Sequence, residues 1–348
     1  MRPELAFGGM FDRPHEIIKQ IVRNVEKVIV GKTEMIEKSV TALLCGGHIL
    51  LEDVPGVGKT MLARALAATF GCTCKRIQFT SDMLPGDVIG ASVYNQKTGE
   101  FVFREGPVMA NIVLADEINR ASPKTQSALL ECMEEKCVTV DGGTYPLPDP
   151  FIVVATQNPP HLLGTSTLPE AQMDRFLLRL KMGYPESGQE VDMLDLISAE
   201  HPVSRLKPVI AVEEWREIQL AVRSVFVDAD IKQLIVHLAQ QTRIHPDVLL
   251  GVSPRGSGAL LKAAQAWAWM HERDFVVPDD VLYFAPDVLT HRLMLRPEAE
   301  MDGKTADDIL REAVQKTAVP HIGGKDFGLM RRHEGSGRRA NRTVGVWE

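Results

Sequence analysis

The sequence predicts an α/β fold, in which a parallel sheet lies between helices, followed by a small all-helical domain. Short, continuous apolar runs occur at residues 48–52, 112–115 and 151–155. Runs of this length without alternation are typical of strands covered on both faces. Segments with helical spacing separate them. After residue 186 the strand-like runs become sparse and helical patterns dominate.

Helices are expected on both sides of the first strand. Apolar residues recur near helical spacing in residues 17–30 and 36–44. The strand at 48–52 ends in a loop rich in Gly and Pro, after which residues 60–70 are rich in Ala and Leu and indicate a helix. A later helix is expected at residues 126–135. The α/β part therefore begins with a strand, a loop and a helix.

Two hairpins are expected within this pattern. In the first, residues 91–94 and 101–103 flank a polar turn segment. In the second, residues 138–140 and 144–147 flank Asp141-Gly142-Gly143, which is a hairpin turn signal. Both interrupt an otherwise regular alternation of strands and helices.

The change in pattern near residue 186 divides the chain. We assign residues 1–186 to the α/β domain with its leading helices, 187–324 to the helical domain and 325–348 to a flexible basic tail. Helical patterns at residues 231–242 and 259–271 support the second assignment. The tail holds six Lys or Arg against three Asp or Glu, with few apolar residues.

Composition and targeting signals narrow the classes of function. The formal net charge of -7 gives no overall reason to bind nucleic acid or an anionic membrane. The N-terminus lacks the apolar core of a secretory signal, and no apolar run reaches the ~20 residues that a spanning helix needs. We therefore expect a cytoplasmic protein without an integral membrane segment or a nucleic-acid partner.

The five cysteines are an odd number, and their spacings match neither a disulfide framework nor a paired zinc site. Cys72-Thr73-Cys74 is compatible with a soft metal, although reduced structural thiols are the preferred interpretation. The pairs His15-Glu16 and His271-Glu272 lack the second histidine of the H-E-x-x-H zinc motif.

The strongest chemical motif follows the first strand. Its residues, with the next helical position, are Val54, Pro55, Gly56, Val57, Gly58, Lys59, Thr60 and Met61. Gly56 and Gly58 let the backbone turn so that successive N–H groups face an anion, helped by the N-terminus of the next helix. Lys59 would reach the β- and γ-phosphates and Thr60 would bind Mg²⁺, as in the Walker A pattern. Asp53 replaces the first glycine of that pattern, and a glycine-rich turn that binds nothing is the alternative.

Two acidic residues follow the apolar run at 112–115 and would stand beside this loop. Asp116 is expected to hold Mg²⁺ through its water shell. Glu117 is placed to orient and deprotonate the attacking water. Alone, such a pair fits a solvated strand end equally well, but the phosphate loop in the same chain favours the functional interpretation. Asn158, after the third strand, would bind the water or the γ-phosphate, or serve as a turn residue.

These motifs occur in the order expected of AAA+ ATPases. The run from Asp116 to Glu131 closely resembles the MoxR family of the helix-2-insert clade, and residues 52–60 and 168–176 are also similar to it. The resemblance covers about residues 15–320. In that family Asp is common at the first Walker A position. The resemblance implies a nucleotide domain with a helical lid, one hairpin inserted in the second helix and another before the sensor strand.

The resemblance also implies ATP and Mg²⁺ as cofactors and a ring, typically a hexamer, with nucleotide at subunit junctions. By motif position, Asn158 is the first sensor, Arg175 the arginine finger and Arg255 the second sensor, while Gly31 lies near the adenine. Arg179 could share the finger role. A finger stabilises charge that builds during phosphoryl transfer and can be worth about 10³–10⁵ in rate.

The resemblance favours an ATP-driven ring machine that remodels or matures partner proteins, often with partners that carry von Willebrand factor A domains. A metal-chelatase motor subunit shares this architecture and remains an alternative. A second alternative is a nucleotide-gated binding module with little turnover. An unchanged kcat in Glu117→Gln would support the module.

Overall fold

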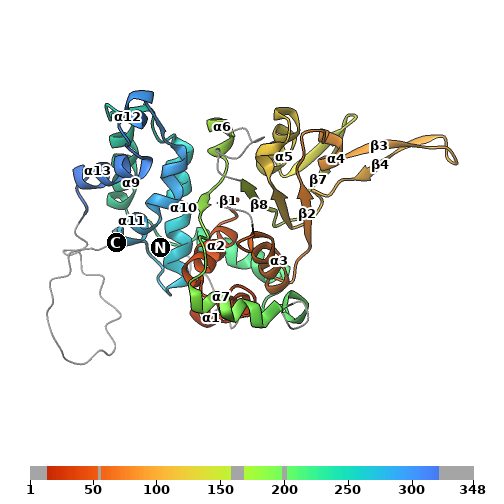
Figure 1. Ribbon diagram of the computed structural model, residues 1–348, viewed down its shortest axis with the longest axis horizontal. Helices are drawn as coiled ribbons and strands as arrows, with labels where there is room; N and C mark the ends of the chain where they lie inside the picture. Colours follow the sequence, from red (N-terminus) through yellow and green to blue (C-terminus); the bar gives the residue numbers. More distant parts are fainter. Residues whose placement is uncertain (1–13, 54–55, 158–167, 198–201, 321–348) are drawn as a thin grey trace, which may run out of the picture.

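The computed structural model describes residues 14–53, 56–157, 168–197 and 202–320. The α/β part, with a projecting hairpin, lies on one side of the molecule, and the helices of residues 229–316 lie on the other (Figure 1). Val54, Pro55, Asn158 and the predicted tail lie outside the described residues. No described helix combines the length and the apolar character needed to span a bilayer.

A five-stranded parallel sheet forms the centre of the α/β part. Its strands are β1 (Ile49–Glu52), β2 (Cys74–Gln78), β5 (Ile112–Asp116), β8 (Ile152–Gln157) and β9 (Leu178–Leu180). Their order is β2-β5-β8-β1-β9, and every pairing is parallel. The three strands predicted from the sequence are confirmed as β1, β5 and β8. Because all strands run the same way, their carboxyl ends share one edge of the sheet.

The two strands that the sequence analysis missed lie at the edges of the sheet. β2 carries Lys75 and Arg76, both exposed, so no apolar run marks it. β9 has three residues, which is too short for a periodic signal. In contrast, β5 and β8 are buried at every residue. The apolar run therefore predicts inner strands, which are covered on both faces, and not edge strands.

Alternate strand residues pack into two cores, one on each face of the sheet. The helices involved are α1 (Pro14–Glu26), α2 (Thr33–Leu44), α3 (Lys59–Thr69) and α5 (Pro123–Glu135). Ile112 and Leu114 of β5 join the core that contains α1, α2 and α3. Val113 and Ala115 join the core that contains α5. Successive side chains of a strand point to opposite faces, which explains the division.

Helix α1 ends before the predicted limit at residue 30. The Val28 and Ile29 amides both donate to the Val25 carbonyl, at 2.9 and 3.0 Å, and close a turn. Val28 and Ile29 are nevertheless buried. The apolar spacing in this segment thus indicates which residues are buried, and it continues past the last residue of the helix.

Both predicted hairpins are confirmed. The first follows the short helix α4 (Pro85–Ile89) and consists of β3 (Gly90–Asn95) and β4 (Glu100–Glu105), which project from the body (Figure 1). The second consists of β6 (Cys137–Val140) and β7 (Gly143–Pro146). Its two turn residues, Asp141 and Gly142, have φ of 48° and 80°, as a type I′ turn requires. Phe103 stacks on Tyr145 with ring centroids 4.0 Å apart and joins the hairpins.

The first hairpin does not split a longer helix in two. It follows the five-residue helix α4 and leads to β5. Gly90 ends α4 with φ +99°, and a Cβ there would lie 2.4 Å from the Arg104 carbonyl oxygen. Glycine therefore permits both the turn out of the helix and the close approach of the returning strand.

The C-terminal part is helical except for one short antiparallel pair. Its elements are α7 (Ser187–Ile197), η2 (Pro202–Arg205), α8 (Val212–Arg223), α9 (Ala229–Arg243), β10 (Val248–Leu250), α10 (Pro254–Met270), α11 (Pro278–Leu289), η3 (Thr290–Arg292), β11 (Met294–Leu295), α12 (Pro297–Met301) and α13 (Ala306–Lys316). Strands β10 and β11 correct the expectation of an all-helical domain. The helices predicted at 231–242 and 259–271 are confirmed as α9 and α10. Two single turns, η1 (Ile118–Arg120) and α6 (Glu170–Met173), complete the set.

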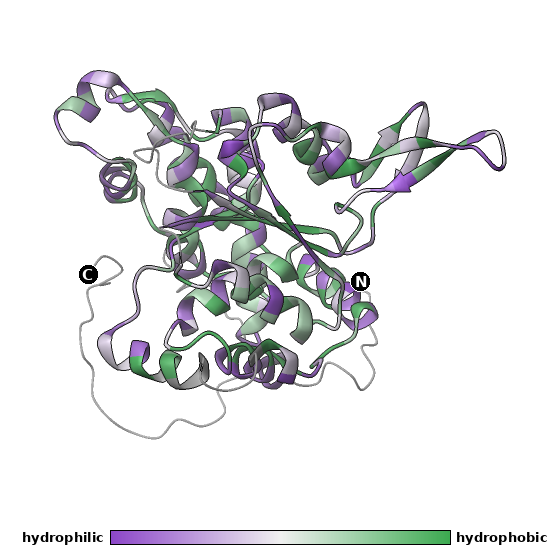
Figure 2. Cartoon of the chain, turned by 45° about the vertical axis from the view of Figure 1, so that its right-hand side comes forward, coloured by the Kyte–Doolittle hydropathy of each residue, from purple (hydrophilic) through white to green (hydrophobic). Residues whose placement is uncertain are grey.

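One apolar core runs from the sheet into the lid. Buried residues of α2, α3, α8 and α10 belong to the same cluster, and apolar segments lie where the helices face each other (Figure 2). Trp215 of α8 donates from Nε1 to the Leu43 carbonyl at 3.0 Å. The boundary at residue 186 stays a prediction.

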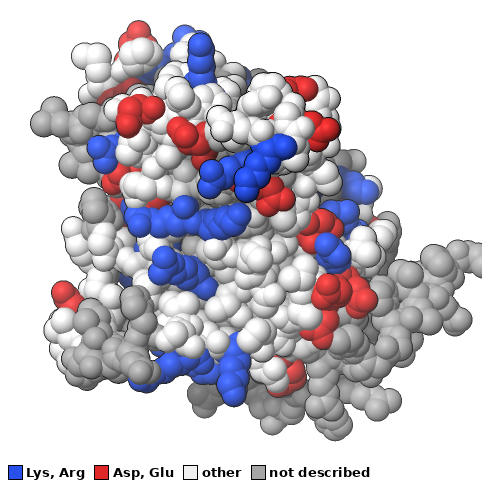
Figure 3. Space-filling model, turned by 90° about the vertical axis from the view of Figure 1, so that its right-hand side faces the viewer, with Lys and Arg blue, Asp and Glu red and all other residues white. Residues whose placement is uncertain are grey.

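Charge is unevenly distributed on the surface. On the face seen from the hairpin side, basic side chains gather across the middle and acidic side chains lie nearer the borders (Figure 3). The net charge of -7 therefore does not describe every face.

Candidate functional site

The phosphate loop lies at the carboxyl edge of the sheet, between β1 and α3. Gly56 and Gly58 have φ of 89° and 98°. A Cβ on Gly56 would meet nothing within 4 Å, so the backbone conformation, rather than lack of space, requires glycine there. Gly58 precedes the first residue of α3, whose opening turn contains Thr60 and Met61. Free N–H groups of that turn are suited to bind an anion.

Lys59 lies in this loop with an exposure of 7%. Its Nζ donates to the Asp53 carbonyl oxygen at 2.6 Å. Burial lowers the pKa of Lys59, and the nearby charges of Asp53, Asp116 and Glu117 oppose that shift. The ammonium group thus lies among carboxylates at the position from which it can turn to phosphate oxygens.

Asp53, which replaces a Walker A glycine, has a structural contact of its own. Its Oδ2 accepts from the Gly183 amide at 2.5 Å. This bond ties the start of the phosphate loop to the segment that follows β9. The carboxylate therefore has a function at that position that glycine could not supply.

Asp116 is the last residue of β5, and its two carboxylate oxygens have different partners. Oδ1 accepts from Thr156 Oγ1 at 2.6 Å. Oδ2 accepts from Arg76 at 2.6 and 3.1 Å. Asp116 is buried, with an exposure of 9%. A buried carboxylate is a fitting ligand for Mg²⁺, but the Arg76 contact would have to give way for direct coordination.

Glu117 follows with φ 55°, a left-handed conformation that is uncommon outside glycine. Its amide donates to Thr156 Oγ1 at 2.8 Å. Its Oε2 accepts from Gln78 Nε2 at 3.0 Å and from Arg120 at 2.8 Å. These bonds hold the carboxylate near the carboxyl ends of β2 and β5. Strained backbone of this kind concentrates at functional sites.

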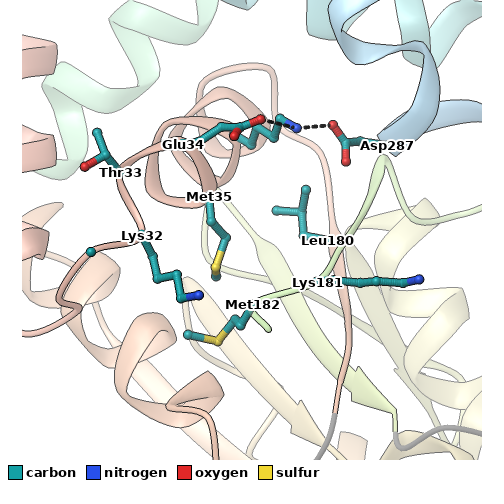
Figure 4. Close-up of a pocket in the computed structure, with 10 residues that line it drawn as sticks. Lys32, Thr33, Glu34, Met35, Leu180, Lys181, Met182 and Asp287 are labelled. Carbon is teal, nitrogen blue, oxygen red and sulfur yellow. Dashed lines mark ion pairs between the residues drawn. The ribbon is translucent and has the colours of Figure 1, made fainter. Parts of the chain in front are cut away.

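A cavity of about 300 Å³ lies beside the phosphate loop. Lys32 and Met35 line it from one side and Met182 from another (Figure 4). Gly31 also belongs to its lining. The Met182 methyl lies 3.6 Å from the position that a Cβ on Gly58 would take, so the cavity adjoins the loop. Its size is at the lower end for small-molecule pockets. The Gly31 position is thus compatible with a base beside the phosphates.

An ion-pair network between helices α2 and α11 closes this cavity on one side. Lys38 Nζ lies 2.8 Å from Glu34 and 2.7 Å from Asp287, the latter on helix α11 (Figure 4). Burial raises the pKa of Asp287, whereas the Lys38 charge opposes the shift. A nucleotide here would contact both domains.

Arg175 and Arg255, in contrast, meet at a second cavity of about 410 Å³, which we call the cationic cavity. Its charged side chains are Glu134, Lys136, Asp174, Arg175, Arg255, Lys262 and Arg292. Arg175 donates to the Leu130 carbonyl at 2.7 Å and pairs with Glu134 at 3.1 Å. Arg255 also pairs with Glu134. Both arginines therefore converge on one carboxylate.

The cationic cavity lies at the amino-terminal edge of the sheet, opposite the phosphate loop. Gly47 and His48, which precede β1, line it. Lys136, at the end of α5, donates to the carbonyl of Phe151, which precedes β8. The four residues of β1 separate the two edges, by roughly 13 Å at about 3.3 Å per residue. Within this chain the structure does not bring Arg175 or Arg255 to Lys59.

Arg179 lines neither the cavity beside the phosphate loop nor the cationic cavity. It lies on β9, where it pairs with Glu52 at 3.2 Å and donates to Thr290 Oγ1 of the lid at 3.1 Å. Glu52 ends β1 on the phosphate-loop edge. Arg179 thus links that edge to the lid.

Comparisons with known proteins agree with this architecture. The family of ATPases associated with various cellular activities matches residues 48–178, and the AAA lid domain matches residues 240–313. Chaperone MoxR1 of Mycobacterium tuberculosis is 38% identical over 314 residues, which cover 88% of this chain and 83% of that protein. The chain belongs to the MoxR family of AAA+ ATPases.

Other relatives share nearly the whole length of this MoxR-family chain. The Bacillus subtilis protein YeaC, which has no named function, is 57% identical over 88% of this chain and 96% of its own length. A crystal structure of a Cytophaga hutchinsonii protein, provisionally named an ATPase, has 38% identity and a TM-score of 0.82, and covers 88% of this chain and 96% of its own. The predicted fold class is thereby confirmed.

Four side chains of this MoxR-family site were missed at the sequence level. They are Arg76, Gln78, Glu134 and Thr156. Gln78 and Thr156 lie at or near the carboxyl ends of strands next to β5, so sheet order would have pointed to them. That order was not apparent, because β2 has no apolar run. Glu134 is on an amphipathic helix, where an acidic residue carries no signal of its own.

Proposed function

We propose that this MoxR-family protein hydrolyses ATP to ADP and phosphate with Mg²⁺, in a head-to-tail ring whose subunits complete one another's sites. The observation that carries the proposal is the position of Arg175 and Arg255 at the sheet edge opposite Lys59. A surface that complements a different surface of the next copy makes a heterologous contact, which closes into a ring when the rotation allows. The hexamer implied by the family resemblance is one such ring.

In the proposed site, the α3 amides and Lys59 hold the phosphates. The Thr60 hydroxyl and the Asp116 carboxylate are the oxygen ligands suited to Mg²⁺, which would neutralise charge on the β- and γ-phosphates. Glu117 accepts the proton of the attacking water, and the Thr156 hydroxyl holds the Asp116 carboxylate and the Glu117 backbone amide. Asn158, the residue that follows β8 in the sequence, is proposed as the first sensor.

The neighbouring subunit supplies the positive charge. Arg175 would contact the γ-phosphate as the finger, with Arg255 beside it as the second sensor. Glu134 holds both arginines and would release them or turn with them when the phosphate arrives. Arg179, tied to Glu52 and Thr290, instead couples the loop to its own lid.

We extend the proposal to the work performed. We propose that the protein remodels or matures partner proteins, which the relative named a chaperone supports. The family resemblance suggests partners that carry a von Willebrand factor A domain. It also suggests a cytoplasmic location. Exposed apolar pairs on the projecting hairpin, Tyr94 with Phe101 and Val93 with Val102, offer a surface for protein contacts.

The test mixes two inactive variants. Lys59→Ala removes the subunit's own nucleotide binding but leaves its arginines, whereas Arg175→Ala keeps the phosphate loop and removes the finger. Each alone should show little turnover. In an equal mixture, about a quarter of the junctions join an intact Lys59 of one subunit to an intact Arg175 of the next. ATPase activity should therefore return to about a quarter of that of the unaltered protein.

Mixing Lys59→Ala with the doubly altered Lys59→Ala/Arg175→Ala chain is the matched control and should stay inactive. An Arg175→Ala protein with wild-type turnover, or mixtures with no recovery, would contradict the assignment of Arg175 to the neighbour's site.

A further inference from the structure

The cationic cavity holds more positive charge than its own carboxylates balance. Five Lys or Arg side chains line it against Glu134 and Asp174. The acids pair with arginines: Glu134 with Arg175 and Arg255, and Asp174 with Arg292 at 2.9 Å. The lysines are left without a carboxylate partner in the cavity.

The two lysines differ in their contacts. Lys136 donates to the Phe151 carbonyl at 3.2 Å, and burial lowers its pKa to about 8. Lys262 has no hydrogen bond or ion pair with any described residue, and its side chain is exposed. Lys262 is therefore the cation that is available to a ligand.

Helix α10 presents Lys262 on the same face as Arg255. Arg255, Gly258, Ala259 and Lys262 all line the cavity, at the i, i+3, i+4 and i+7 positions that share one helix face. Seven residues span about 10 Å of helix. A Cβ on Gly258 would meet nothing within 4 Å, so the floor between the two cations is open. A group that bears several negative charges over a few ångströms fits this face.

We propose that Lys262 is a phosphate-binding residue that acts across the subunit junction, on the γ-phosphate of the ATP held by the neighbouring subunit. This inference rests on the proposed function, which assigns the same cavity to that junction. Lys262 would add a charge-assisted hydrogen bond to those of Arg175 and Arg255. Since ADP lacks the γ-phosphate, the contact would favour ATP over ADP.

The experiment measures nucleotide affinity in assembled Glu117→Gln protein, in which hydrolysis does not interfere. Adding Lys262→Ala should raise the dissociation constant for ATP about tenfold, as expected for a lost charged hydrogen bond, and leave that for ADP unchanged. Lys262→Arg should retain most of the ATP affinity. Lys232→Ala, which removes an exposed lysine of α9 outside the cavity, is the matched control.

The same nucleotide titrations, repeated at a protein concentration too low for assembly, show whether Lys262 contacts the nucleotide of its own subunit or that of a neighbour. Lys262→Ala should bind ATP there as the unaltered chain does, because its own phosphate loop is at the opposite edge. Wild-type ATP affinity in the assembled Lys262→Ala protein would overturn the inference, as would an equal loss in the isolated subunit.

The alternative ligand for Lys262 is a free phosphate-containing anion, bound without a nucleotide. Isolated Lys59→Ala subunits should bind tripolyphosphate no better than Lys59→Ala/Lys262→Ala subunits. Binding that depends on Lys262 in those subunits would assign the cavity to a free anion and overturn the nucleotide assignment. Recovery of activity in the Arg175→Ala mixture, together with an unaffected Lys262→Ala protein, would leave the proposed function intact and refute this inference alone.

Discussion

At the residue scale, one hydroxyl that the sequence analysis did not single out connects the two acidic residues of the site. Thr156 donates to Asp116 at 2.6 Å and accepts from the Glu117 amide at 2.8 Å. Its exposure is only 1%. Thr156 therefore holds the Asp116 carboxylate and the Glu117 backbone at once. Gln78 and Arg120, in contrast, hold the Glu117 carboxylate.

Glu117→Gln tests the proposed base. The amide keeps the shape of the side chain but accepts no proton from water, so kcat should fall by about 10²–10⁴, while ATP stays bound. Single-turnover hydrolysis and ATP binding measure the two effects. Glu213→Gln, an exposed site on α8, should leave both unchanged. A wild-type kcat in Glu117→Gln would instead favour the nucleotide-gated module.

The burial of His48 leads us to expect that the protein loses stability at acidic pH. Burial lowers its pKa to about 3, and the Lys136 charge adds to the shift; its Nδ1 accepts from the Val153 amide at 2.9 Å. Since the folded pKa lies below the ordinary value of about 6.5, the unfolded chain binds the proton first. The free energy of unfolding should therefore decrease as the pH is lowered below about 6.5, by up to about 1.4 kcal/mol per pH unit.

Denaturant unfolding at pH 7 and pH 5 measures this dependence. His48→Gln cannot take up the proton, so its stability should depend less on pH, even if it is lower at pH 7. An equal pH dependence in both proteins would show that other groups cause the acid lability.

At the element scale, burial on both faces determines which strands could be predicted. β1, β5 and β8 are inner strands and show apolar runs, whereas β2 and β9 are edge strands and do not. The hairpin at residues 137–146 was predictable because its turn chemistry is local: Asp141 and Gly142 adopt the positive φ that the turn requires. The β10–β11 pair has no such local signal.

Helix α8 packs on the α/β part through Trp215. This side chain is fully buried, donates to Leu43 and packs on Phe70 with ring centroids 5.0 Å apart. Trp215→Ala should lower the free energy of unfolding by about 3–5 kcal/mol, as measured with denaturant. Phe226→Ala, at a side chain 53% exposed, should cost far less. Equal losses would show that Trp215 does not hold the two parts together.

At the scale of the whole molecule, the phosphate loop and the cationic cavity face opposite edges of one sheet. The surplus positive charge of the cavity opposes the approach of another positive surface, and the phosphates of a bound nucleotide would compensate it. Nucleotide binding and assembly should therefore be linked, since each favours the other.

ATP should consequently promote assembly more than ADP does. In the Glu117→Gln protein, sedimentation should show larger oligomers with ATP and Mg²⁺ than with ADP, and added salt should weaken them. Arg175→Ala should reduce the difference between the nucleotides. Oligomers of one size in ATP, in ADP and without nucleotide would count against this linkage.

The sequence by itself determined the fold class, the inner strands, both hairpins and the phosphate loop, because these depend on local patterning and on the backbone freedom of particular glycines. It also supplied Asp116, Glu117, Arg175 and Arg255 as candidates. Only the tertiary structure decided that the two acids lie beside Lys59 and the two arginines at the opposite edge, because those distances depend on the strand order and on how α5 and α10 pack. That separation carries the proposal of a site shared between subunits.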